Sequence, residues 1–474
     1  MAIIMLLLTA CNKKLDIVPE DTLTERQALE KQASAEGILG DAYTKLFEAC
    51  REQAYTMGDQ STEMMEFQPY LQHNRWYEGL YGPRTNEDES MPINFWANNY
   101  KTINLANVVI NKLPAYGQFN RQLMQQYVAE AKFIRAFSYF NLLKYFGDGA
   151  LEGRMEGLGV PLRLEAYDGY DASKNIPRSS NKKVYEQILK DIDEAIPELV
   201  VAFGNEVSTR SRAVKGSANA LGARVALYMQ NYELALKYSN EVLMNANYVD
   251  AASILDVFAD NSGNEIGKQT KLNMAIPELI FAFPVSHNNA GLNSGSSVNH
   301  GIDYIFGGIF FNPAFLSSYE SNDIRANQLF INVSFFSLPP VKISRKFSDP
   351  NQTDNLVAFR RAELVLTKAE ALANINGLNQ QSVDLLNLIH QRSFVASQRP
   401  VPYTMGSFGS KQALIDAILR ERSWELAGEG QDRFDRMRTG RNVNPVLPRY
   451  KYALPVPYKE IVITGGLIEQ NTGY

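Results

Sequence analysis

Two segments of this chain combine aromatic rings with amide and charged side chains in a mixture that is typical of sugar-binding surfaces. Pyranose rings stack their apolar faces on flat aromatic side chains, and their hydroxyls require amide, carboxylate or guanidinium partners. Both segments, residues 67–84 and 287–311, lack helical periodicity, which predicts loops. They supply ten candidate ligand-binding residues: Tyr70, Asn74, Arg75, Trp76, Tyr77, Tyr81, His287, Asn288, Asn289 and Tyr304.

The aromatic side chains of these loops could instead fill a secondary core beneath them. For Phe306, Phe310 and Phe311 we favour this packing role, because large apolar side chains are the usual content of a core. Trp76 has polar neighbours in the sequence, so a binding role and a packing role both stay open for it.

A different chemistry is indicated by Cys11, which follows an apolar run that ends Leu8-Thr9-Ala10. This is the pattern that a bacterial lipoprotein signal peptidase cuts, after which the cysteine carries the lipid. Each acyl CH₂ buried in a bilayer contributes roughly 0.8 kcal/mol, so two or three chains anchor a protein firmly. The sequence predicts a signal peptide over residues 1–10, lipidation of Cys11 and a polar tether over residues 11–24. Residues 1–10 carry no Lys or Arg, and a free cysteine is the alternative.

Motifs for catalysis are missing from the sequence. No two of the four histidines have the i, i+4 spacing of a helical zinc site, and no nucleophile elbow, P-loop or dinucleotide fingerprint occurs. Glu421 and Glu425 lie one helical turn apart, but interleaved arginines favour an ion-pair network over a proton donor. The acidic run 87–89 favours a solvated loop over a calcium site. We therefore expect no enzyme, no cofactor and no bound metal.

Composition agrees with an exported soluble body. The chain has 474 residues, a formal net charge of −5 and a pI near 5.7, which argues against a general nucleic-acid role. After Cys11 no apolar run approaches the ~20 residues of a membrane helix. Cys50 is the only other cysteine, so with Cys11 lipidated no intrachain disulfide forms.

Helical periodicity dominates the rest of the chain. Residues 213–230 and 232–246 are separated by Asn231 alone and carry small residues where the two helices would cross. This pattern, and that of residues 359–375 and 380–393, favours tetratricopeptide-like pairs over a plain antiparallel bundle. Residues 255–355 break the pattern, with short β-like runs, and a loop tail is expected after Gly428. The predicted helices cover about 25–49, 94–112, 121–146, 183–200, 213–230, 232–246, 359–375, 380–393 and 411–427.

Several segments, in order along the whole mature chain, resemble the SusD/RagB family of surface lipoproteins of Bacteroidota-type bacteria. They are the sequence before Cys11, Leu15-Asp16-x-x-Pro19, Gly58-Asp59, YVAEAKFIRAFSYFNLLKYFGD (127–148), VPL (160–162), PRSSNKKVYEQILKDIDEAI (177–196), AELVLTKAEAL (362–372), ILRERSWELAGEGQDRFDRMRTGR (418–441), LPVPYKEI (454–461) and IEQNTGY (468–474).

The resemblance implies an all-α fold in which a tetratricopeptide-like helix-pair scaffold is capped by an irregular, loop-rich region with small strands. It divides the body into an N-terminal helical region, 25–250, and a C-terminal region, 251–474. It implies a lipid-anchored outer-membrane protein at the cell surface that captures oligosaccharides and delivers them to a SusC-like TonB-dependent transporter. The alternatives are a peptide-binding RagB-like uptake lipoprotein and a protein-assembly scaffold. The ligand site is expected in the loop after Gly58-Asp59 and a loop of the second half, with no residue assigned individually.

Overall fold

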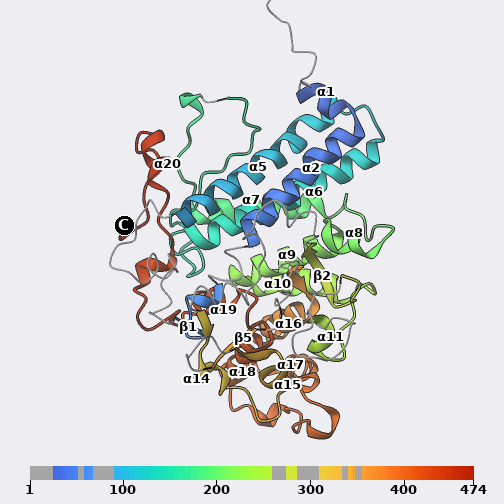
Figure 1. Ribbon diagram of the computed structural model, residues 1–474, viewed down its shortest axis with the longest axis vertical. Helices are drawn as coiled ribbons and strands as arrows, with labels where there is room; N and C mark the ends of the chain where they lie inside the picture. Colours follow the sequence, from blue (N-terminus) through green and yellow to red (C-terminus); the bar gives the residue numbers. More distant parts are fainter. Residues whose placement is uncertain are drawn as a thin grey trace, which may run out of the picture.

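The computed structural model describes residues 25–51, 58–67, 90–169, 171–258, 274–284, 309–333, 340–344, 346 and 355–474 (Figure 1). Cys11, the signal peptide and the tether lie outside these residues. The described chain is mainly helical, and its few strands are short, which confirms the predicted fold class.

Long antiparallel helices form the N-terminal half, at the top of Figure 1. Asn120 caps α6 by accepting a hydrogen bond from the Leu123 N–H at 3.0 Å, and the helix ends at Gly147, as predicted. Phe133, Phe137 and Phe140 of its apolar stripe are buried. These helices are α1 (Glu25–Glu30), α2 (Gln32–Arg51), α5 (Ser90–Tyr116), α6 (Arg121–Phe146) and α7 (Asn181–Ala195).

Both predicted helix pairs are present. In the first pair the helices cross closely: a Cβ placed on Gly222 would lie 3.0 Å from the Tyr238 ring. In the second pair the turn contains Gly377, whose φ of 73° favours glycine. The pairs are α9 (Lys215–Tyr228) with α10 (Tyr232–Leu243) and α16 (Arg361–Asn376) with α17 (Gln380–Arg392), and α8 (Glu206–Ser211) and α18 (Lys411–Glu425) flank them.

The described strands form three two-stranded antiparallel sheets. Two of them include the β-like runs predicted in the C-terminal half, at residues 279–285 and 328–336. The pairs are β1 (Met65–Phe67) with β3 (Ile309–Phe311), β2 (Leu279–Phe283) with β6 (Leu356–Arg360), and β4 (Phe330–Val333) with β5 (Val341–Ser344).

The prediction of a loop tail after Gly428 is wrong, because the tail contains two short helices. Seven residues are too few to form a stable helix alone, so α19 depends on burying Phe434 and Met437 against the body. Periodicity over so few residues carries little signal, which explains the error. The tail helices are α19 (Asp432–Arg438) and α20 (Tyr458–Ile463), and the region predicted to be irregular also contains α11 (Ile254–Phe258), α14 (Pro313–Leu316) and α15 (Ile324–Gln328).

The end of the chain is fastened to the N-terminal half at the last turn of α6. The carbonyl oxygen of Phe146 accepts hydrogen bonds from Arg178 Nη2 at 2.8 Å and Asn471 Nδ2 at 3.0 Å. Arg178 also donates to the carbonyls of Gly159 and Glu469. A helix C-terminus carries partial negative charge, so a guanidinium is a favourable partner there.

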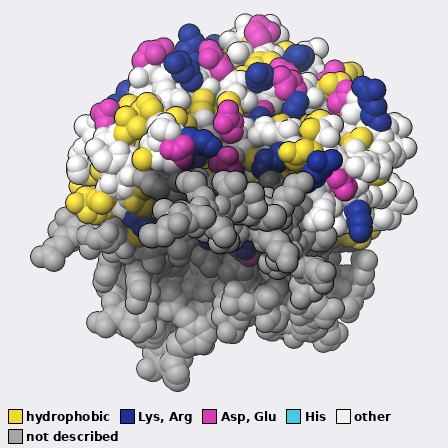
Figure 2. All heavy atoms as spheres, turned by 90° about the horizontal axis from the view of Figure 1, so that it is seen from above, with side chains coloured by type: hydrophobic (Ala, Val, Ile, Leu, Met, Phe, Trp, Pro, Cys, Tyr) yellow, Lys and Arg dark blue, Asp and Glu magenta, His cyan; other side chains and the backbone are white. Residues whose placement is uncertain are grey.

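None of the described helices is both long and apolar enough to cross a membrane. On the face shown in Figure 2, Lys and Arg side chains alternate with Asp and Glu side chains, and hydrophobic side chains form small separate groups.

Candidate functional site

All ten candidate ligand-binding residues lie outside the described part of the chain, but the strands that border their loops are described. The structure corrects the ends of both predicted loops, because Phe67 is the last residue of β1 and residues 309–311 form β3. These two strands pair, with Phe67 opposite Ile309 and Met65 opposite Phe311. The structure therefore fixes the start of one candidate loop beside the end of the other, although the two are far apart in the sequence.

Aromatic side chains pack β3 against the helical part of the protein. Phe310 and Phe311 are buried, which confirms the packing role predicted for them. The Phe311 ring meets the Phe330 ring edge-on at 4.6 Å between centroids, and Phe330 in turn contacts Tyr319. Tyr319 stacks on Trp424 of α18 at 5.4 Å. These ring contacts connect β3 to the helical scaffold through Phe330, Tyr319 and Trp424.

The segment that precedes β1 is also attached to the body of the protein, at Gly58 and Asp59. The buried Asp59 carboxylate accepts hydrogen bonds from the N–H groups of Gly430 at 2.9 Å and Asp432 at 3.1 Å. Burial, with a contribution from the nearby Asp432, raises the pKa of Asp59 to about 7. The segment that leads into the first candidate loop is therefore held on the turn before α19.

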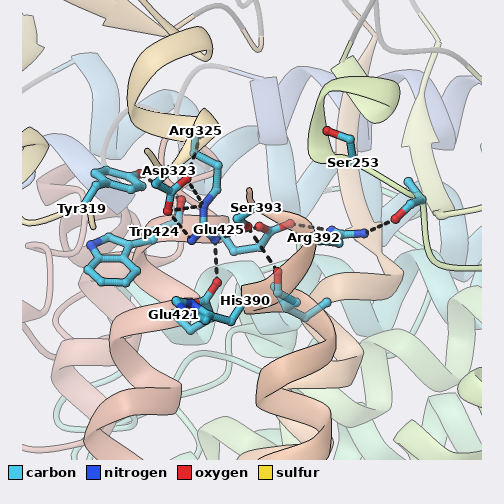
Figure 3. Close-up of polar contacts among 12 residues, drawn as sticks. Ser253, Tyr319, Asp323, Arg325, His390, Arg392, Ser393, Glu421, Trp424 and Glu425 are labelled. Carbon is cyan, nitrogen blue, oxygen red and sulfur yellow. Dashed lines mark hydrogen bonds and ion pairs between the residues drawn. The ribbon is translucent and has the colours of Figure 1, made fainter. Parts of the chain in front are cut away.

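The charged residues of α18 form a buried ion network (Figure 3). Arg325 Nη1 lies 2.6 Å from Glu421 Oε1 and 3.1 Å from Glu425 Oε2. Glu425 Oε1 also accepts from Arg360 at 2.6 Å and from Arg392 at 2.7 Å. All of these side chains are almost fully buried. The five side chains come from four elements, α15, α18, β6 and α17, so the network joins elements that are distant in the chain.

This network confirms the interpretation of Glu421 and Glu425 as ion-pair partners. Burial by itself raises the pKa of Glu425, but Arg392, Arg360 and Arg325 outweigh it and hold that pKa well below its usual value. The pKa of Glu421 is also lowered, against burial, by Arg325 and His390. A carboxylate that stays ionised and enclosed by guanidinium groups cannot donate a proton, so this pair is unsuited to acid catalysis.

The described part of the chain offers few other groups that could bind a metal or react. Within it, no group of three His, Cys, Asp or Glu residues could hold a metal ion. Cys50 is buried, and burial raises the pKa of its thiol to about 11, which leaves it unreactive at neutral pH. Trp96 and Trp424 are also buried, so Trp76 is the one tryptophan that the described structure does not assign to the core.

Comparison with known families yields two matches. A model described as "Starch-binding associating with outer membrane" (SusD-like) matches residues 15–227. A second model, described as "SusD family", matches residues 317–444.

Individual proteins show the same similarity over nearly the whole chain. SusD-like protein P38 of Formosa agariphila is 24% identical, and the match covers 98% of this chain and 96% of the relative. A SusD superfamily protein from Bacteroides thetaiotaomicron superimposes with a TM-score of 0.76 at 20% identity, covering 93% of this chain and 99% of that one. A laminarin-binding SusD-like protein superimposes with a TM-score of 0.71 at 21% identity, covering 94% and 100%.

Proposed function

This chain belongs to the SusD/RagB family, and from that premise we propose that it is a cell-surface lipoprotein that captures oligosaccharides without hydrolysing them. It passes them to a SusC-like TonB-dependent transporter in the outer membrane. Cys11 carries the lipid, and residues 11–24 tether the body to the membrane.

The pairing of Phe67 with Ile309 is the observation that supports the site most directly. The start of the first aromatic and amide-rich loop lies beside the end of the second, which supports a site where side chains of both loops act on one ligand. The site is built by Tyr70, Asn74, Arg75, Trp76, Tyr77 and Tyr81 of the first loop, with His287, Asn288, Asn289 and Tyr304 of the second.

A glycan is the ligand that these residues suit best. The rings provide stacking surface, and the amide and guanidinium groups provide partners for hydroxyls. The laminarin-binding relative of the same fold supports this choice of ligand class. A peptide lacks the apolar sugar faces that stack on flat aromatic side chains. Peptide uptake and pure scaffolding are therefore the alternative outcomes of the test.

Isothermal titration calorimetry with a panel of oligosaccharides tests the proposal. Trp76→Ala is expected to weaken binding by roughly 1–3 kcal/mol, the scale of losing one buried ring, with an unchanged melting temperature. Trp76→Phe keeps a ring and should retain most of the affinity. Because Trp96 and Trp424 are buried, a fluorescence change on glycan addition should also disappear in both variants.

Three results would contradict parts of the proposal. Absence of heat with every glycan, together with heat from peptides, would favour the peptide-binding alternative. Unchanged affinity in Trp76→Ala would remove Trp76 from the site. Release of reducing ends by the purified protein would show that it is an enzyme.

A further inference from the structure

A groove of about 940 Å³ lies in the N-terminal half, away from the β1–β3 pair. One wall is α5, and the other is an extended segment, residues 160–167, which we call the strap. Residues 168–169, residues 171–176 and α20 close the ends, and Asp41 and Lys45 of α2 complete the lining. This volume is at the upper end of the range for ligand sites, and neither the proposed glycan site nor the ion network uses it.

Side chains of α5 and α6 hold the strap by one edge of its backbone. Asn107 Nδ2 donates to the carbonyls of Arg163 at 2.9 Å and Glu165 at 3.1 Å. The hydroxyls of Tyr100 and Tyr139 donate to the carbonyls of Pro161 and Arg163. The bonded carbonyls belong to residues 161, 163 and 165, which is the two-residue period of a β-strand.

The opposite edge of the strap is unpaired. In the part of the chain that the structure describes, the backbone N–H and C=O groups of Leu162 and Leu164 make no hydrogen bond. Neighbouring residues of an extended chain direct these groups to opposite sides, so Leu162 and Leu164 present theirs away from the side chains that bind residues 161, 163 and 165. Both leucines line the groove. An unpaired strand edge is a template for another extended chain.

The surroundings of this edge also suit a polypeptide. Tyr167, at the end of the strap, is 60% exposed and Ile463 of α20 is 44% exposed, and both line the groove. Exposed apolar side chains that gather beside a groove with a polar rim are typical of protein interaction sites. The lining carries both signs of charge, with Lys101, Glu165 and the ion pair between Lys174 and Asp168.

We propose that an extended segment of the transporter polypeptide adds as a strand to the free edge of the strap. This inference rests on the proposed function, which supplies the membrane partner. In Figure 1 the strap, α20 and the start of α1 lie at the same end of the long axis. Residues 11–24 span at most about 50 Å when fully extended, so a lipid on Cys11 keeps this end close to the membrane. Main-chain hydrogen bonds give such strand addition its affinity, and alternate side chains give it specificity.

Hydrogen exchange at single-residue resolution tests the inference, with the full-length lipoprotein measured alone and in complex with its SusC-like transporter in detergent. We expect exchange at the Leu162 and Leu164 amides to slow by about tenfold or more in the complex. The amides of Ala166 and Tyr167 already donate to Asn111 and Asn104, so their exchange should stay unchanged and serves as the internal control.

A matched pair of variants provides a second measurement. Leu164→Pro removes an N–H that bonds nothing within the described protein, and it should weaken the complex by about tenfold or more. Leu164→Ala loses the side chain but keeps the N–H and should weaken it less. Melting temperatures of both variants show whether the fold is intact. If Leu164→Pro does not fold, hydrogen exchange in the wild-type complex still tests the inference.

The outcomes separate this inference from the proposed function. A complex that leaves the Leu162 and Leu164 amides unprotected overturns the strap as the docking edge, while glycan calorimetry still supports uptake. Protection of these amides by an oligosaccharide alone would make the groove a glycan site and overturn the inference. If no complex forms at all, the strand addition and the transporter partnership are both wrong.

Discussion

Gly58 lies where a side chain has no room. A Cβ on this residue would be 2.0 Å from the carbonyl oxygen of Gly430, a backbone atom that cannot move without displacing the turn before α19. Gly58→Ala should therefore lower the free energy of unfolding by about 3 kcal/mol or more, measured by urea denaturation. Gly37→Ala in α2 is the control: nothing lies within 4 Å of its Cβ, and alanine should stabilise the helix by about 0.5–1 kcal/mol. Equal effects of the two substitutions would contradict the close contact.

Asp59 should make stability depend on pH in the opposite direction from most carboxylates. Its pKa is about 7 in the folded protein, because burial disfavours the charged form, and about 3.9 in an unfolded chain. The folded state then binds the proton more tightly, so this stabilisation is complete below about pH 4 and is lost as the pH rises through 7. Relative to Asp59→Asn, which is neutral throughout, the wild type should lose stability between pH 5 and 8. Parallel pH profiles of the two proteins would exclude this assignment.

The ion network is the feature that holds α15, α17, α18 and β6 together. Glu425 contacts three guanidinium groups, so Glu425→Gln removes a carboxylate that three buried arginines share, although each of them keeps another carboxylate partner. We expect a loss of about 3–5 kcal/mol in the free energy of unfolding. Glu320→Gln is the control, because its carboxylate is 35% exposed at the edge of the network, and exposed ion pairs contribute about 0–1 kcal/mol.

The same network predicts loss of stability in acid. The pKa values of Glu421, Glu425 and Glu429 are all lowered in the folded protein, where nearby Arg, Lys and His side chains outweigh the effect of burial. Groups of this kind stabilise the fold fully above their unfolded pKa, about 4.3, and the stabilisation is lost as the pH falls through their folded values. A wild-type unfolding midpoint that does not change from pH 5 to pH 3 would contradict the network.

At the scale of the whole molecule, attachment to the membrane should depend on Cys11 in cells that lack the transporter. The proposed anchor, Cys11, precedes the body by one short polar segment. Cys11→Ala should leave the protein unprocessed or release it from the outer membrane, as fractionation of cells lacking the transporter would show. Retention of the variant in that fraction would contradict the lipid anchor. Cys50→Ala is the control, since its thiol is buried in the body.

The amino-acid sequence by itself determined the helical scaffold. Helices such as α6, and the pairs α9–α10 and α16–α17, repeat apolar residues over several turns, so their positions follow from information within each segment. An asparagine also caps the start of α6, α10 and α17. The aromatic and amide content of the two candidate loops, and the charge pattern around Trp424, are equally local. Each could be interpreted before any contact between distant segments was known.

Only the tertiary structure decided how distant segments combine. Phe67 pairs with Ile309, and Asp59 accepts hydrogen bonds from Gly430 and Asp432. Each of these contacts joins residues that are separated by more than half the chain. No local sequence pattern specifies such a partner. The short helix α19 was missed because tertiary burial, rather than periodicity, stabilises it, and α20 was missed because six residues are too few to show a helical period. The free edge of the strap is likewise a tertiary feature, since α5 and α6 bind one side of that backbone and leave the other side open.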